Sequence, residues 1–145
     1  MEKIKIEKGT VQETLLIPLY GRKYAMDRYP DLFMDHDCQV LFDRIDFTVP
    51  DNMKGMLGNI GCIMGATRQY DMASACRAYL KKHPKACVVN IGCGLDTTFR
   101  QVDNGKAKGY NLDFPDTIAI RNELLGKRER EFNIACDLND TSWFD

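Results

Sequence analysis

Apolar residues recur at intervals of three and four along the first half of the chain, which is the spacing of helices that bury one face. Thr10 and Glu13 have the spacing of a capping box, so a helix is predicted to start just before Val11. Pro18 should kink or restart this helix, because proline lacks the backbone N–H that a helix interior uses. A turn is expected at residues 29–31.

Three more helical segments are predicted before Pro84, with a turn or cap at residues 50–52. They cover residues 37–45, 53–64 and 67–82. The apolar positions on their expected core faces are Val40, Leu41, Ile45, Met53, Met56, Leu57, Ile60, Ile63, Met64, Met72, Ala73, Cys76, Tyr79 and Leu80. The last segment should end at Lys82, since cations in a final turn and a proline just beyond it favour a helix end.

The second half of the chain alternates between short apolar runs and helical stretches. The predicted strands cover residues 87–91, 107–112 and 132–136. The first of these runs is typical of a buried parallel strand, and helices are expected to start at residues 97–98 and at Pro115. This order is that of the first half of a doubly wound α/β sheet. We therefore expect a helical region over residues 1–84 and a sheet domain over residues 85–145.

A glycine turn follows the first predicted strand. Gly92 and Gly94 let the backbone approach a ligand where a Cβ atom would collide. Asp113 ends the second strand at the spacing from which a carboxylate accepts hydrogen bonds from ribose hydroxyls. The pattern predicts a nucleotide-like cofactor at the carboxyl ends of the strands.

Two cofactor classes fit this turn, a dinucleotide and S-adenosylmethionine. The dinucleotide fingerprint has a third glycine where this chain has Thr97. Asp96 places a carboxylate where a pyrophosphate would be repelled, whereas a cofactor with a sulfonium and an amino group tolerates that charge. The local chemistry thus favours S-adenosylmethionine and leaves a nicotinamide-dependent oxidoreductase as the weaker alternative.

Composition and charge narrow the class of protein further. The 145 residues include 20 Lys and Arg against 21 Asp and Glu, so no cationic surplus supports nucleic-acid binding. No apolar run is long enough for a membrane span. The six cysteines show no C-x-x-C spacing and the two histidines no ligand pattern, which predicts reduced thiols in a cytoplasmic protein without a metal site.

Several motifs together resemble the leucine carboxyl methyltransferase family, and within it the bacterial polyketide-type O-methyltransferases. The motifs are VVNIGCGLDT at residues 88–97, VDNG at residues 102–105, LDFPD at residues 112–116 with Arg121, and PLYGR at residues 18–22. The resemblance extends over nearly the whole chain, including the segment from Asp31 to Asp46. It implies a class I, Rossmann-like methyltransferase fold that binds S-adenosylmethionine and methylates a carboxylate or hydroxyl oxygen.

The resemblance also implies roles for residues of the sheet domain. Gly92 and Gly94 would pass under the methionine and ribose of the cofactor, and Asp113 would bind the ribose hydroxyls. Asp137 would hold the adenine amino group, with Leu138 as an apolar contact.

Two arginines of the helical region complete the implied cofactor site. Arg68 would pair with the cofactor carboxylate, because a planar guanidinium can meet a carboxylate with two hydrogen bonds, and Arg22 would assist. Cys93 has no histidine base nearby in sequence, so we interpret it as a small apolar residue rather than a nucleophile. No catalytic base is identified, and the acceptor is a small molecule or a protein carboxylate.

The family's sheet has seven strands, and this chain is expected to be truncated after the third. The strand at residues 87–91 would then have an unpaired edge and bare apolar surface beside it. We expect self-association or a completing polypeptide at that edge. An alternative from another class is a catalytically silent homologue that acts as a binding or oligomerisation module.

Overall fold

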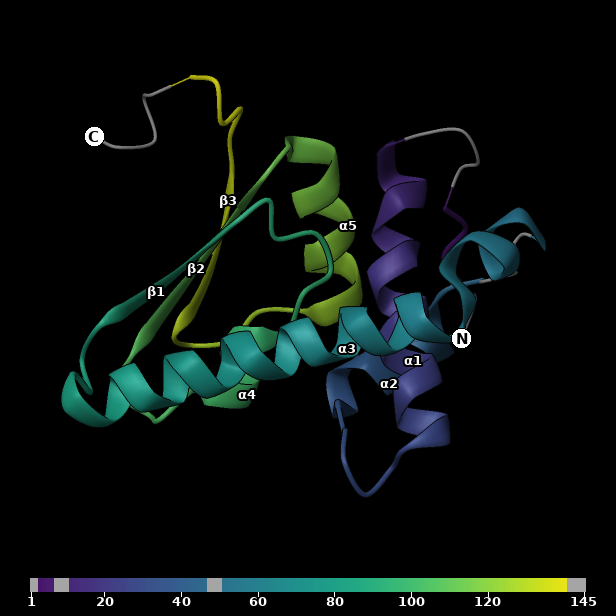
Figure 1. Ribbon diagram of the computed structural model, residues 1–145. Coiled ribbons are helices and arrows are strands. Elements are labelled where there is room, and N and C mark those ends of the chain that lie inside the picture. Colours follow the sequence, from purple (N-terminus) through teal and green to yellow (C-terminus); the bar gives the residue numbers. More distant parts are fainter. Residues whose placement is uncertain (1–2, 7–10, 47–50, 141–145) are drawn as a thin grey trace. The chain divides into compact units, whose positions relative to one another are not determined.

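The computed structural model describes residues 3–6, 11–46 and 51–140, with the side chains of residues 11–12 and 51–58 left out (Figure 1). The helices are η1 (Val11–Leu15, a 3-10 helix), α1 (Leu16–Arg28), α2 (His36–Arg44), α3 (Asp51–Lys82), α4 (Thr98–Val102) and α5 (Pro115–Leu125). The strands are β1 (Cys87–Ile91), β2 (Lys108–Asp113) and β3 (Glu131–Ala135). Thr10 of the expected capping box and Pro50 of the expected turn lie outside the described residues.

The chain forms two compact units, residues 1–72 and residues 73–145, and the division falls within α3. The change of pattern after residue 84 therefore does not coincide with this division. The domain ranges 1–84 and 85–145 stay a prediction.

The first unit is helical, as predicted. Leu19, Leu41 and Ile45 are fully buried in it. The change from 3-10 to α geometry at Leu16 places Pro18 in the first turn of α1, where a helix does not need its N–H. The expected restart of the helix near Pro18 is confirmed, because the α-helix starts at Leu16 after a 3-10 helix.

The core positions expected on the helices were only partly correct. No break precedes Thr67, because α3 is continuous from Asp51 to Lys82. Ile60 is 75% exposed, whereas Cys62 and Ala66 are buried. The other expected core positions found exposed are Val40, Ile63, Met64, Met72 and Tyr79. Apolar residues lie on several sides of α3, so spacing alone does not tell which side is buried.

The second unit contains a parallel sheet with strand order β1-β2-β3 (Figure 1). The three strands lie within one residue of the predicted ranges. Pro115 opens α5 and Gly126, with φ +64°, follows its last residue. The predicted α/β fold, the first half of a Rossmann-like methyltransferase sheet behind a helical N-terminal region, is confirmed.

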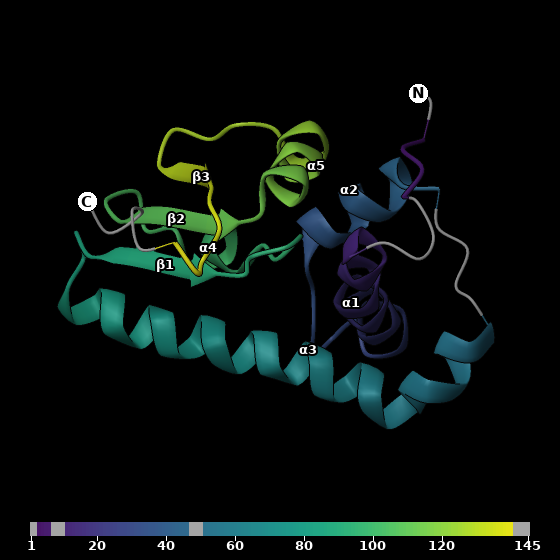
Figure 2. The same ribbon diagram turned by 90° about the horizontal axis from the view of Figure 1, so that it is seen from above.

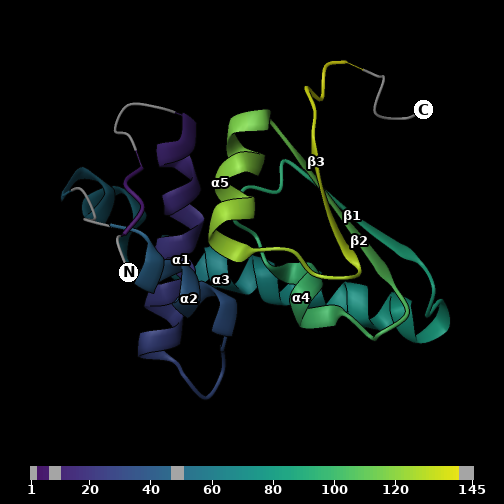
Figure 3. The same ribbon diagram turned by 180° about the vertical axis from the view of Figure 1, so that it is seen from behind.

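One face of the sheet packs against helices. The ring of Phe99 in α4 lies directly over Gly109 of β2, and Arg121 of α5 reaches Asn133 of β3. Figures 2 and 3 show α4 and α5 beside the sheet from two further directions. The apolar cluster on this face consists of Ala73, Leu80, Phe99, Val102 and Ala107, with Cys76, Ala86 and Val88 against it.

The other face of the sheet is apolar and open. The strand register aligns Val89 with Tyr110 and Phe132, and Ile91 with Leu112 and Ile134. On β1 and β3, the two outer strands, the apolar side chains of this face are exposed. The exposed fraction is 52% for Val89 and 56% for Ile91. The expectation that β1 is buried was wrong, because nothing among the described residues covers this side of it. The expected bare apolar surface beside β1 is confirmed.

Candidate functional site

The glycine turn follows β1 directly and has the backbone conformation that glycine favours. Gly92 and Gly94 have φ values of +64° and +47°. The N–H groups of Gly92 and Cys93 both donate to the carbonyl oxygen of Leu112, at 2.9 and 3.1 Å. A Cβ atom at Gly92 would meet nothing within 4 Å. The turn is thus fixed to the end of β2, with its backbone open at Gly92.

Asp113 lies against this turn. Its Oδ2 accepts a hydrogen bond from the Gly94 N–H at 2.7 Å, and its Oδ1 accepts one from the Phe114 N–H at 2.8 Å. The side chain is half-buried. A carboxylate oxygen can accept two hydrogen bonds, so Asp113 can hold the turn and still receive hydroxyl groups of a ligand.

Asp96 organises the start of α4. Its Oδ1 accepts hydrogen bonds from the Thr98 N–H at 2.9 Å and from Asn90 Nδ2 at 3.0 Å. Its Oδ2 accepts one from Thr98 Oγ1 at 2.9 Å. A carboxylate therefore occupies the helix start at which a dinucleotide fold binds pyrophosphate.

Arg121 joins the turn to the helix-covered face of the sheet. The side chain is fully buried, and its Nη1 donates to the carbonyl oxygens of Gly94, at 2.9 Å, and Asp96, at 2.6 Å. Its Nε donates to Asn133 Oδ1 at 3.0 Å and its Nη2 to Glu131 Oε1 at 2.8 Å. The sequence motif included Arg121, but nothing in the pattern revealed these contacts.

Glu131 balances the charge of two buried arginines. Arg100 Nε donates to its Oε2 at 2.7 Å, and Asn111 Nδ2 donates to its Oε1 at 3.0 Å. Burial alone would raise the pKa of Glu131, but Arg100 and Arg121 outweigh it and hold that pKa below its usual range. Glu131 is therefore ionised near neutral pH.

Cys93 is an inert thiol within the turn. The side chain is buried, and burial raises its pKa to about 12. The interpretation of Cys93 as a small apolar residue is confirmed. All six cysteines are free, also as predicted.

Asp137 and Leu138 follow β3, at the same end of the sheet as the glycine turn and Asp113. The N–H of Cys136 donates to the carbonyl oxygen of Asp113 at 2.9 Å, which ties these chain segments together. Asp137 is exposed, and its Oδ1 accepts hydrogen bonds from the Asn139 N–H and Nδ2, both at 2.9 Å. Ligands bind at the carboxyl ends of the strands in open α/β sheets, where all five predicted residues of this unit lie.

The two predicted arginines lie in the first unit, and they differ in environment. Arg22 is buried in α1, where its Nη1 forms an ion pair with Asp35 Oδ2 at 2.9 Å. Asp35 also caps α2 by accepting a hydrogen bond from the Cys38 N–H at 3.0 Å. Arg68 is exposed on α3. Arg22 therefore already serves a structural role in its ion pair with Asp35, whereas Arg68 is exposed to solvent.

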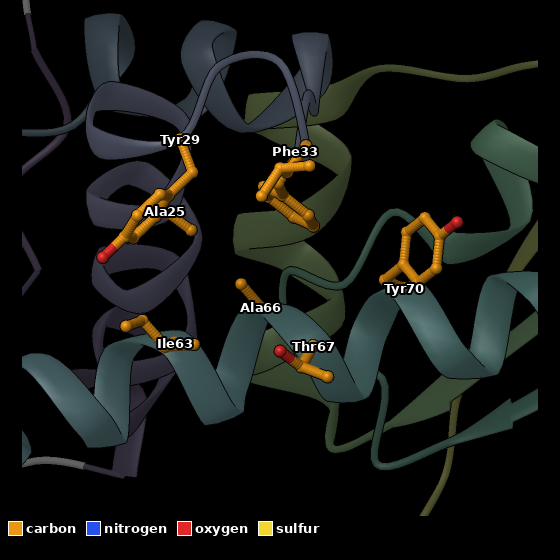
Figure 4. A pocket seen from close by; sticks show the side chains of 8 residues that line it. Ala25, Tyr29, Phe33, Ile63, Ala66, Thr67 and Tyr70 are labelled. Carbon is orange, nitrogen blue, oxygen red and sulfur yellow. The ribbon is translucent and has the colours of Figure 1, made fainter.

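The first unit also contains an apolar cavity of about 400 Å³ (Figure 4). Residues from the end of α1, the following loop and α3 line it, among them Tyr29, Phe33, Ile63, Ala66, Thr67 and Tyr70. Its volume is within the range of small-molecule sites, which are mostly apolar with a few polar groups. The sequence pattern did not predict it.

The described ranges contain neither a candidate membrane span nor a candidate metal site. No helix there is both long and apolar enough to cross a membrane. The same residues contain no group of three or more metal-ligating side chains.

Comparisons with known proteins relate the chain to one family of methyltransferases. The leucine carboxyl methyltransferase family matches residues 23–145. The chain is 26% identical over 136 residues to the tetracenomycin polyketide synthesis O-methyltransferase TcmP of Streptomyces glaucescens, which covers 93% of this chain. The chain spans about half of that relative, 49% of its length. The match over most of its residues shows that the chain belongs to the leucine carboxyl methyltransferase family.

Proposed function

We propose that this chain forms the S-adenosylmethionine-binding part of an O-methyltransferase. The observation that carries the proposal is the contact between Gly94 and Asp113 beside a turn that is open at Gly92. A backbone that a ligand can approach and a carboxylate for ribose hydroxyls fit this cofactor. Family membership supports the same reaction class.

The residues of the sheet unit would each perform one part of binding. The backbone at Gly92 and Gly94 would pass under the methionine and ribose, and Asp113 would accept hydrogen bonds from the ribose hydroxyls. Asp137 and Leu138 would contact the adenine. When bound, the cofactor supplies a methyl group activated by its sulfonium, so the protein mainly has to position an acceptor oxygen.

Arg68 would pair with the cofactor carboxylate. Its exposed position on α3 and the ability of guanidinium to form two parallel hydrogen bonds with a carboxylate support this role. Arg22 keeps the assisting role that the resemblance implies, in addition to its ion pair with Asp35.

The acceptor in this proposal is a small apolar molecule with a hydroxyl or carboxylate oxygen. Two observations support a small molecule over a protein carboxylate. The cavity of about 400 Å³ is lined by the aromatic side chains of Tyr29, Phe33 and Tyr70. The relative from Streptomyces glaucescens is named for polyketide synthesis. The cytoplasmic location expected from the cysteines stays a prediction.

Calorimetric titration of this chain with S-adenosylhomocysteine, the product form of the cofactor, tests the proposal. We expect saturable binding that Asp113→Asn and Arg68→Ala each weaken, and no binding of NAD. A folded chain that binds NAD instead, or that binds neither ligand, would contradict the proposal. Arg77→Ala, which also changes an arginine on α3, is the control for Arg68.

The open apolar face supports one alternative, a binding or oligomerisation module. Val89, Ile91, Phe132 and Ile134 expose apolar side chains on adjacent strands, and such patches mark interaction surfaces. Light scattering at several concentrations tests it. Mass that rises with concentration supports self-association, whereas a monomer throughout, with no binding of a hydrophobic dye, contradicts it.

A further inference from the structure

We propose that Arg121 is the positioning residue of the cofactor-binding turn, with its guanidinium fixing the turn's carbonyl groups from inside the protein. The inference rests on the proposed function, because it states that Arg121 raises the affinity of that same site for the cofactor. Arg121 itself would not touch the cofactor.

Gly94 shows most directly how the turn is held. Its N–H donates to Asp113 Oδ2 and its carbonyl oxygen accepts from Arg121 Nη1. The same Nη1 also binds the carbonyl oxygen of Asp96, two residues further along. One guanidinium group therefore orients two peptide groups in a segment that begins with positive φ angles.

The turn needs such external contacts because glycine is conformationally permissive. Gly92 and Gly94 can adopt many backbone conformations, so their own sequence does not select one. A turn ordered before the ligand arrives avoids the cost of ordering it during binding. The contacts of Arg121 supply that order.

Arg121 is itself fixed by β3. Asn133 accepts from its Nε and Glu131 from its Nη2, and the guanidinium is fully buried. Four hydrogen bonds from one planar group require the fork of arginine, which the single ammonium of lysine does not reproduce. The position of the turn is thus tied through Arg121 to the third strand.

The test compares Arg121→Lys with Arg100→Lys. Both arginines pair with Glu131, but Arg100 also donates hydrogen bonds to the carbonyl oxygens of Leu125 and Gly126, at the end of α5 rather than at the turn. Thermal unfolding, titration with S-adenosylhomocysteine and amide hydrogen exchange are measured for both. A merely structural role would lower the thermal midpoint of both variants and leave the affinity of both alike.

We expect both substitutions to lower the thermal midpoint and only Arg121→Lys to weaken S-adenosylhomocysteine binding, by on the order of tenfold. Exchange of the Gly94 amide should also speed up only in Arg121→Lys. Unchanged affinity and unchanged Gly94 exchange in Arg121→Lys would overturn the inference, as would equal losses in the two variants.

Two further outcomes are a variant that does not fold and an unaltered chain that does not bind S-adenosylhomocysteine. If Arg121→Lys does not fold, Asn133→Ser is measured in its place and should weaken binding more than Arg100→Lys does. This substitution removes the acceptor of Arg121 Nε and of Asn111 Nδ2, together with the donor to Asn122 Oδ1. If the unaltered chain does not bind S-adenosylhomocysteine, the proposed function fails. Exchange at Gly94 then decides the positioning role alone: faster exchange supports it and unchanged exchange overturns it.

Discussion

The two faces of the three-stranded sheet differ in almost every physical respect. The covered face combines an apolar cluster, formed with residues of α3 and α4, with a buried polar network around Arg121 and Glu131. The opposite face presents apolar side chains such as Val89 and Ile91 to solvent. The strands are the same, so the difference comes from what packs on them.

The order of the candidate site comes from β2 and from the covered face. The glycine turn contacts β2 through Leu112 and Asp113, and the covered face through Arg121. None of these contacts uses the exposed side chains of the open face. Changes on the covered face should therefore alter both stability and the turn, whereas changes on the open face should alter association.

Removal of Glu131 should have the largest effect on the covered face. Glu131→Ala leaves Arg100 and Arg121 buried without their shared counter-ion, which should lower the free energy of unfolding by about 3 to 5 kcal/mol. Chemical denaturation measures this. Asp103→Ala, which breaks the more exposed ion pair with Arg130, is the control and should have a far smaller effect. Equal losses would contradict the account.

The pH dependence of stability should report the ionisation of Glu131. Because the folded protein holds the pKa of Glu131 below its usual range, the stability from this ionisation is fully present above the unfolded value of about 4.3. It is lost as the pH falls through the lower folded pKa. Unfolding followed at pH 3 to 6 should show this loss in the unaltered chain and a flatter profile in Glu131→Gln. Parallel profiles would contradict the assignment.

A methyl group at Gly109 should disturb the apolar part of the covered face. Its Cβ would lie 2.4 Å from the ring of Phe99, which is itself buried, so Gly109→Ala should cost about 1 to 3 kcal/mol of unfolding free energy. Gly65→Ala in α3 is the control, because a Cβ there meets nothing within 4 Å. That substitution should stabilise the helix by about 0.5 to 1 kcal/mol. A neutral Gly109→Ala would show that the face is loosely packed.

The smallest change in stability is expected on the open face. Val89→Thr should alter the free energy of unfolding by less than about 0.5 kcal/mol, because the side chain is exposed and threonine keeps the branched shape. Combined with Ile91→Thr, it should reduce binding of a hydrophobic dye. A large destabilisation would mean that this face is covered in solution.

The strands and their ends could be predicted closely because local chemistry marks them. Gly92 follows β1, Asp113 ends β2 and Pro115 opens α5, and each of these residues favours a boundary through its own backbone or side chain. The glycine turn and Asp113 could be placed together because parallel strands bring their carboxyl ends to one edge of the sheet.

Burial and the polar network could not be predicted in the same way, because they depend on distant partners. The apolar run of β1 is typical of a buried strand whether or not helices cover both faces. Arg121 and Glu131 look like surface charges in a mixed-charge segment, yet the fold buries them together. Asn111 and Asn133, polar residues inside two predicted strands, were the one available signal of that network.

Amide chemical shifts recorded during titration with S-adenosylhomocysteine show directly whether the cofactor binds at the glycine turn. We expect the largest changes at residues 92–96 and at Asp113, with smaller changes at Asp137 and little change at Val89 or Phe132. Changes centred on the open face, with residues 92–96 unaffected, would contradict it.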